Sequence, residues 1–161
     1  ETHLVVSPEG ERVIAHETSW TTRDLRALAS RTHDWADLMA PPSSGSFAVD
    51  AMVVIPCSVK TLSAIAHSYS ANLLARAADV TLKERRRLVL VVRESPLHWG
   101  HLDTMRRVAV MGALVCPPVP AMYQRPRSVA DIVDSTVGKI LDLVGIDHEL
   151  CSRWGEEQVP V

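Results

Sequence analysis

Cysteines are few in this sequence and show no regular spacing. Its 161 residues include three, Cys57, Cys116 and Cys151, which are odd in number and far apart. A disulfide framework needs paired cysteines, and a zinc site needs ligands at short, recurring spacings. Neither kind of site fits this arrangement, and we therefore expect reduced thiols and a cytoplasmic location.

Long hydrophobic runs and an excess of positive charge are missing as well. Hydrophobic residues make up 47% of the chain, yet no apolar run approaches the roughly 20 residues of a membrane-spanning helix. No charged and then apolar leader opens the sequence, so we expect no secretory signal. The formal net charge of −2 argues against a general nucleic-acid-binding protein, which is usually basic. The expected partners therefore include neither nucleic acid nor a membrane.

What the sequence does contain is an alternation of strand-like and helix-like segments. Four apolar runs have the length of strands: residues 2–6, 51–55, 88–92 and 113–116. Helices are predicted over residues 22–31, 59–77, 97–111 and 129–144, and a short extended piece over 13–15. Ser128 and Gly145 are the expected cap and stop of the last helix. Continuous apolar strands are typical of a parallel sheet covered on both faces, which predicts a doubly wound α/β fold.

The length suits a single domain, which we place at residues 1–150, with residues 151–161 as a tail. In a doubly wound sheet, ligands bind beyond the carboxyl ends of the strands. Ser7 follows the first predicted strand, "PCSVKT" (56–61) the second and Arg93-Glu94 the third, and a proline-rich loop leads from the fourth to Tyr123. This edge is the predicted functional site.

Two segments at this edge suit phosphate chemistry. The hydroxyls of Ser58 and Thr61 lie beside the N–H groups of a helix start, which favours an anion, although an ordinary N-cap is an equally good interpretation. Arg93 could contact a phosphate through two parallel hydrogen bonds, and Glu94 could transfer protons. The alternative for this second segment is a structural ion pair.

Several other residues receive plainer interpretations. Arg85, Arg86 and Arg87 are predicted to be surface charge, and Cys57 a packed thiol. Arg76 and Lys83, which precede the same strand, can also be explained as solvated cations. His98 and His101 share a helical face but have no third ligand at a matching spacing, so no metal site is expected.

Longer stretches carry a family resemblance. "SSGSF" (43–47), residues 56–102 and "PPVPAMYQRP" (117–126) closely resemble the UbiX-like flavin prenyltransferases, earlier taken for aromatic-acid decarboxylases. The resemblance implies a flavodoxin-like (Rossmann-like) fold in three layers and a homo-oligomer, usually a dodecamer. It also implies transfer of the dimethylallyl group from dimethylallyl monophosphate to N5 and C6 of reduced FMN, without a metal. The prenylated FMN would then serve a UbiD-type decarboxylase.

The same resemblance implies roles for individual residues. Ser7, Ser58, Val59, Lys60, Thr61 and Arg93 would bind FMN. The substrate pocket would contain Ser44, Gly45, Ser46, Arg76, Lys83, Arg93, Tyr123 and Lys139, with the serine loop coming from a neighbouring subunit. Glu17, Glu94 and Lys83 would be catalytic. Lys139 stands where the family typically has an arginine, which puts phosphate affinity in question.

The family pattern begins with a further strand and a Gly-Ala-Ser-Gly-like turn. We expect that unit to lie before Glu1, and the alternative is a natural truncation. Two alternatives to the prenyltransferase function remain open. One is an FMN-dependent decarboxylase of the peptidyl-cysteine type, although "PCSVKT" lacks the asparagine of that group's corresponding loop. The other is a non-catalytic FMN-binding subunit.

Overall fold

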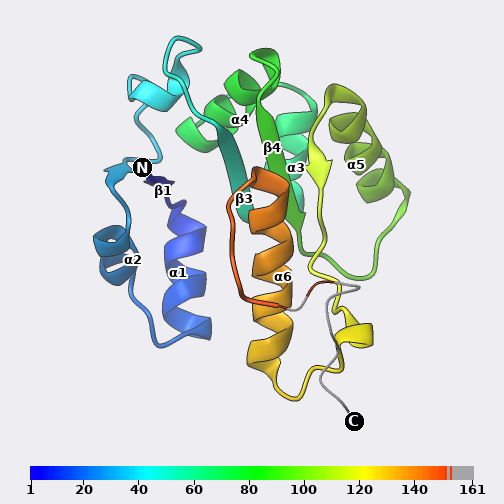
Figure 1. Ribbon diagram of the computed structural model, residues 1–161. Coiled ribbons are helices and arrows are strands. Elements are labelled where there is room, and N and C mark those ends of the chain that lie inside the picture. The colour runs from blue at the N-terminus through cyan, green and yellow to red at the C-terminus, as the bar shows by residue number, and fades with distance from the viewer. Residues whose placement is uncertain (152, 154–161) are drawn as a thin grey trace.

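The computed structural model describes residues 1–151 and residue 153, and it has an α/β fold (Figure 1). Strands and helices alternate along most of the chain. In chain order the elements are β1 (His3–Val5), α1 (Pro8–Glu17), α2 (Thr22–Leu28), β2 (Arg31–His33), η1 (Pro41–Ser43), β3 (Ala51–Cys57), α3 (Val59–Ala66), α4 (Leu73–Lys83), β4 (Arg87–Val92), α5 (Trp99–Met111), β5 (Leu114–Val115), η2 (Met122–Gln124) and α6 (Val129–Val144).

The strands form two parallel sheets. One pairs β1 with β2, and the other has the order β3-β4-β5. The predicted parallel pairing is therefore confirmed, with the strands divided between two sheets. Figure 1 shows β1, α1 and α2 together beside the larger sheet.

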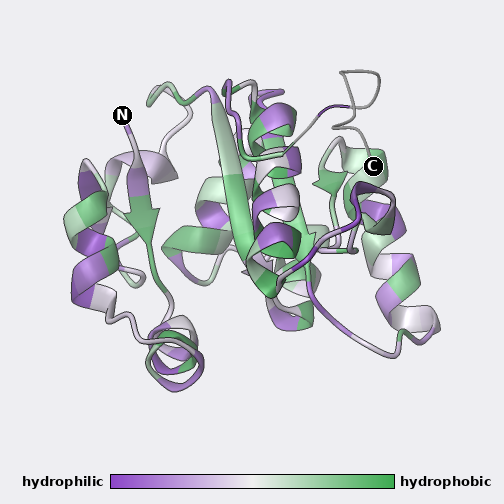
Figure 2. Cartoon of the chain, turned by 60° about the horizontal axis from the view of Figure 1, so that its bottom comes forward, coloured by the Kyte–Doolittle hydropathy of each residue, from purple (hydrophilic) through white to green (hydrophobic). Residues whose placement is uncertain are grey.

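The larger sheet is covered on both faces, which gives three layers. Leu88, Leu90 and Val92 of β4 pack with residues of α3, α4 and α5. Val89 and Val91 point to the opposite face, where Ile140 of α6 covers them. Because both faces of β4 are buried, its sequence is continuously apolar. Figure 2 shows the same distribution, with hydrophobic strands at the centre and mixed helix surfaces around them.

Some predicted boundaries are wrong. Residues 13–15 are helical, because Ser7 caps α1 and Pro8 begins it. The helix predicted over 22–31 stops at Leu28, and the residues from Arg31 onward pair with β1. The helix predicted over 59–77 is two helices, since Asn72 accepts a hydrogen bond from the Ala75 N–H and starts α4 anew.

The last helix agrees with its prediction at both ends. Ser128 and Asp131 form a capping box at the start of α6, and Gly145 ends it in the left-handed region at φ 79°. Of the predicted tail, only Cys151 and Arg153 belong to the described residues, and the remainder lies outside them. No helix in the described part is long and apolar enough to cross a membrane.

Candidate active site

The carboxyl end of β3 leads directly into the start of α3, where two hydroxyls meet the helix N-terminus. Ser58 Oγ accepts a hydrogen bond from the Thr61 backbone N–H (3.2 Å) and donates one to Thr61 Oγ1 (3.2 Å). Ser58 is thus an N-cap, as one of the two interpretations predicts. The cap still leaves room for an anion. The N–H groups of Val59 and Lys60 precede the capped one and have no acceptor inside the helix.

The start of α1 lies beside the start of α3. Lys60 Nζ donates to Glu9 Oε1 at 3.2 Å, which ties the two helix starts together. Glu9's own backbone N–H and Lys60 both stabilise the carboxylate, so the pKa of Glu9 is lower than usual. Ser7 caps α1, accepting from the Gly10 N–H at 3.0 Å. Ser7 and the segment from Ser58 onward therefore share one edge of the fold.

Arg93 and Glu94 follow β4 at the carboxyl end of the larger sheet. The Arg93 backbone N–H donates to the Cys57 carbonyl (3.4 Å), which ties the ends of β4 and β3 together. Both side chains are exposed, and no ion pair joins them within the described residues. Glu94 Oε1 instead accepts from the Ser95 N–H at 3.0 Å. The structural ion pair is not formed, and the Arg93 guanidinium faces solvent.

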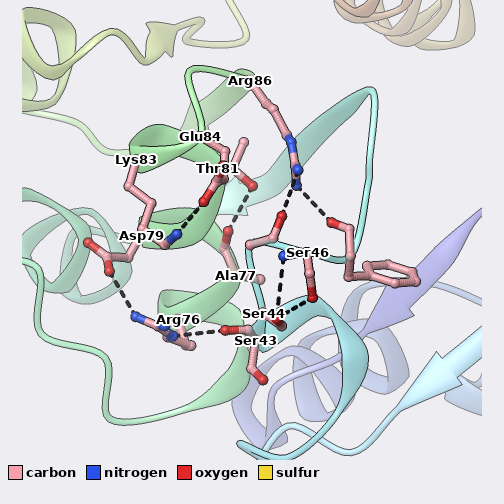
Figure 3. A network of polar contacts seen from close by, with 12 residues as sticks. Ser43, Ser44, Ser46, Arg76, Ala77, Asp79, Thr81, Lys83, Glu84 and Arg86 are labelled. Atoms are coloured by element: carbon pink, nitrogen blue, oxygen red, sulfur yellow. Dashed lines mark hydrogen bonds and ion pairs between the residues drawn. The ribbon is translucent and has the colours of Figure 1, made fainter.

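A second cluster of polar side chains joins α4 to the loop over residues 43–47 (Figure 3). Arg76 Nε donates to the Ser43 carbonyl (3.1 Å), and Arg76 Nη1 to Asp79 Oδ2 (3.2 Å). The hydroxyls of Ser44 and Ser46 are hydrogen-bonded to each other at 2.9 Å. Arg76 and Lys83 lie two helical turns apart on α4, so both belong to the face that the loop covers.

Gly45 allows this loop to approach the end of α4 closely. The Lys83 ammonium pairs with the Glu84 carboxylate, and its hydrogen bond and charge lower the pKa of Glu84. A Cβ on Gly45 would lie 2.6 Å from Lys83 Nζ and would also collide with the Glu84 carboxylate. The serine hydroxyls and the Lys83 ammonium therefore belong to one compact group.

The two clusters lie beyond opposite ends of β4. Helix α4 ends at Lys83, β4 runs from Arg87 to Val92, and Arg93 follows it. A strand of this length spans about 20 Å, because each residue adds about 3.3 Å. Within one chain, Lys83 and Arg93 therefore cannot hold the same phosphate.

Comparison with known proteins identifies the family. The family model described as Flavoprotein matches residues 2–145. The flavin prenyltransferase UbiX of Escherichia coli strain K12 is 51% identical over 156 residues, which cover 96% of this chain and 82% of that protein. The chain belongs to the UbiX family of flavin prenyltransferases.

Two solved structures related to this UbiX family member have the same fold. One is a UbiX structure in complex with FMN and dimethylallyl pyrophosphate, with a TM-score of 0.95 and 48% identity, covering 98% of this chain and 84% of that chain. The other is a dodecameric FMN-dependent UbiX-like decarboxylase from Escherichia coli O157:H7, with a TM-score of 0.93 and 49% identity, covering 96% and 83%. The predicted family and its flavodoxin-like fold are confirmed.

The remaining residues expected in a UbiX site are spread over three further elements. Tyr123 lies in η2, which follows β5, so it is at the same edge as Arg93. Lys139 is an exposed residue of α6. Glu17 is exposed at the end of α1, about 15 Å along the helix from Ser7. Their roles in this UbiX protein stay predictions.

Structural roles explain three residues whose chemistry could suggest catalysis. Cys57 is fully buried, and burial raises the pKa of its thiol to about 12, so it is a packed thiol as predicted. His98 caps α5 by accepting from the Gly100 N–H (3.0 Å), and its ring centroid lies 3.7 Å from that of His101. Within the described part of the chain, no group of three potential ligands could hold a metal.

Arg86 has a structural role that the sequence did not predict. Its interpretation as surface charge is wrong, because the side chain is half-buried and donates to the carbonyls of Gly45 and Phe47. Nothing in the run of three arginines distinguishes the middle one. The available signal was the loop itself, since the carbonyls of an irregular segment need donors from elsewhere.

Proposed function

We propose that this chain is a flavin prenyltransferase, which joins the dimethylallyl group of dimethylallyl monophosphate to N5 and then C6 of reduced FMN. The observation that carries this proposal is the 51% identity to the flavin prenyltransferase of Escherichia coli. The related structure in complex with FMN and dimethylallyl pyrophosphate supports the pairing of a flavin with an allylic phosphate.

The edge formed by the starts of α1 and α3 fits the phosphate end of FMN. Ser58 and the N–H groups of Val59 and Lys60 offer donors at a helix N-terminus, where the helix dipole also favours an anion. Ser7 and Thr61 add hydroxyls at this edge. When bound, reduced FMN supplies the nucleophilic nitrogen and carbon of the reaction. The residues of the chain hold it in place and exclude water.

The cluster on α4 fits the phosphate of the isoprenoid. As the allylic carbon–oxygen bond breaks, negative charge grows on the departing phosphate, and cations placed beside it stabilise that charge. Arg76 and Lys83 supply two cations, and the hydroxyls of Ser44 and Ser46 supply donors. Arg93, Tyr123 and Lys139 complete this pocket in our proposal. Together these cations and donors neutralise the charge of the departing phosphate, as a metal ion does in other prenyl transfers.

Carboxylates account for the proton balance. Closing the fourth ring requires that the double bond of the prenyl group on N5 gain one proton, so that its tertiary carbon can bond to C6, and that C6 lose one proton as the ring becomes aromatic again. Glu94 follows Arg93 at the carboxyl end of β4 and has an exposed carboxylate that can accept the proton lost from C6. Glu17, at the end of α1, is the second candidate.

The separation of the two clusters favours a site shared between subunits. One subunit would provide the FMN edge with Arg93, and a neighbour would provide Lys83, Arg76 and the serine loop. The dodecameric state of a relative that is 49% identical supports a homo-oligomer of this kind. We further propose a cytoplasmic enzyme whose product serves a UbiD-type decarboxylase.

The test is an anaerobic assay with reduced FMN, dimethylallyl monophosphate and the full-length protein. The expected result is prenylated FMN, identified by its mass and absorbance, with release of phosphate. Flavin that binds but never gains the prenyl group would support a non-catalytic subunit and reject the proposal. Carbon dioxide released from a peptidyl-cysteine substrate would support the decarboxylase alternative.

A further inference from the structure

Arg86 differs from the cations around it because both Nη atoms of its guanidinium bind backbone carbonyls (Figure 3). Nη1 donates to the Phe47 carbonyl at 2.7 Å, and Nη2 donates to the Gly45 carbonyl at 2.8 Å. One planar group thus spans two positions of the loop, which the fixed fork of arginine allows and a lysine ammonium does not. The neighbouring Arg85 is exposed.

Contacts on either side of Gly45 hold the same loop. Arg76 binds the Ser43 carbonyl before it. After it, the Phe47 ring packs edge-on against His3, with 5.0 Å between the ring centroids. Between these points Gly45 lies against the Lys83–Glu84 pair. Arg86 is the contact that binds the loop on both sides of Ser46.

We infer that Arg86 is a positioning residue of the isoprenoid-phosphate pocket. By holding the carbonyls of Gly45 and Phe47, it fixes the hydroxyls of Ser44 and Ser46 relative to the Lys83 ammonium. This inference rests on the proposed function, which assigns that cluster to the phosphate. Arg86 acts through the loop, because both of its Nη atoms donate hydrogen bonds to carbonyl oxygens of the loop.

The position of Arg86 predicts a selective effect. Its contacts lie before the start of β4, whereas the edge proposed for FMN lies beyond the carboxyl ends of β3 and β4. Without the guanidinium, the carbonyls of Gly45 and Phe47 form hydrogen bonds with water instead. The loop over residues 43–47 is then no longer held in one position. Affinity for the isoprenoid phosphate should therefore fall while affinity for FMN stays the same.

The experiment compares Arg86→Gln, Arg86→Lys and the matched control Arg85→Gln, which removes the same charge from the adjacent exposed residue. We expect Arg86→Gln to raise KM for dimethylallyl monophosphate about tenfold, equivalent to about 1.4 kcal/mol. Arg86→Lys should recover part of this loss, and Arg85→Gln should change KM less than about twofold. FMN affinity, measured by flavin fluorescence, should be the same in all. An unchanged KM in Arg86→Gln, or an equal loss of FMN affinity, would overturn the inference.

A second measurement does not depend on activity. Hydrogen exchange of the backbone amides at residues 44–47 should be faster in Arg86→Gln than in Arg85→Gln, and equal rates would also overturn the inference. If the unaltered protein transfers no prenyl group, the proposed function fails while the exchange rates still decide the role of Arg86. If Arg86→Gln does not fold, Arg86→Lys provides the test, because one ammonium group cannot span the carbonyls of Gly45 and Phe47 as the guanidinium does. It should raise KM for dimethylallyl monophosphate to an intermediate value and speed amide exchange at residues 44–47; a normal KM with normal exchange would overturn the inference.

Discussion

Lys139 is the residue at which this chain departs from the arginine that its family resemblance implies. A lysine keeps the charge but makes one point contact, whereas an arginine can grip a phosphate with two parallel hydrogen bonds. We expect Lys139→Arg to lower KM for dimethylallyl monophosphate by about threefold to tenfold, as one added charge-assisted hydrogen bond would. Lys139→Gln, the opposite change, should raise KM. Because Lys139 is exposed, neither change should alter the melting temperature appreciably. Steady-state kinetics in which neither variant alters KM would remove Lys139 from the pocket.

Cys57 should be unreactive in the folded protein even though it directly precedes the segment proposed to bind FMN. Burial raises the pKa of its thiol to about 12, so almost no thiolate forms near neutral pH. At pH 8, iodoacetamide should label the partly exposed Cys116 and Cys151 first. Labelling followed by peptide mass analysis measures this order, and all three should react alike in urea. Native labelling of Cys57 as fast as that of Cys116 would contradict the packed position.

At the scale of single residues, the sequence predicted what depends on local bonding. Ser58 is an N-cap because a hydroxyl before a helix start can reach an N–H three positions later, which the sequence alone indicates. Arg86 could not be separated from Arg85, because its partners are 39 and 41 positions away along the chain. Only the fold brings that loop to the end of α4.

At the scale of the elements, the start of α6 depends on its capping box. Ser128 Oγ accepts from the Asp131 N–H (3.1 Å) and donates to Asp131 Oδ1 (2.7 Å), and the helix covers one face of β4. Ser128→Ala should lower the free energy of unfolding by about 1 kcal/mol. Urea denaturation measures this loss. Ser63→Ala, at an exposed position inside α3, is the control. It should not lower the free energy of unfolding, because alanine is the better helix former there.

The β1–β2 sheet should respond to acid through His33. His33 Nε2 lies 2.9 Å from His3 Nδ1, and burial, with the charges of His3 and Arg31, lowers the pKa of His33 below 6.5. As the pH falls through 6.5, the unfolded chain takes up a proton that the folded chain does not, so stability falls with decreasing pH. We expect the melting temperature to drop more between pH 7 and pH 5 in the unaltered protein than in His33→Gln. Equal slopes in thermal scans would show that His33 does not contribute. Asp37, which acts in the opposite direction, stays in both proteins.

Elements were predictable where local pattern and packing agree. Helix α6 has a cap, a stop and a uniform period, and its bounds are as predicted. Residues 59–77 have a continuous helical composition, but Ser68 takes a left-handed backbone (φ 51°) and Asn72 starts a second helix. Strand β2 was missed because its burial pattern is largely exposed, so it lacks the apolar run that marks a strand. Its pairing with β1 defines it instead.

At the scale of the whole molecule, the separation of the two clusters by β4 leads to a complementation test. If one subunit supplies Lys83 and another supplies Arg93, then Lys83→Ala and Arg93→Ala should each be inactive alone. Co-expressed in mixed oligomers, they should regain activity, because random mixing gives about a quarter of the sites both intact halves. A mixture of Lys83→Ala with Arg76→Ala is the matched control: both changes fall in the same half of the site, so every mixed site keeps a damaged phosphate pocket. Prenylated FMN formed by the purified mixtures is the measurement. Activity of the first mixture no greater than that of the control would mean that the clusters do not complete each other across subunits, and the shared site would have to be abandoned.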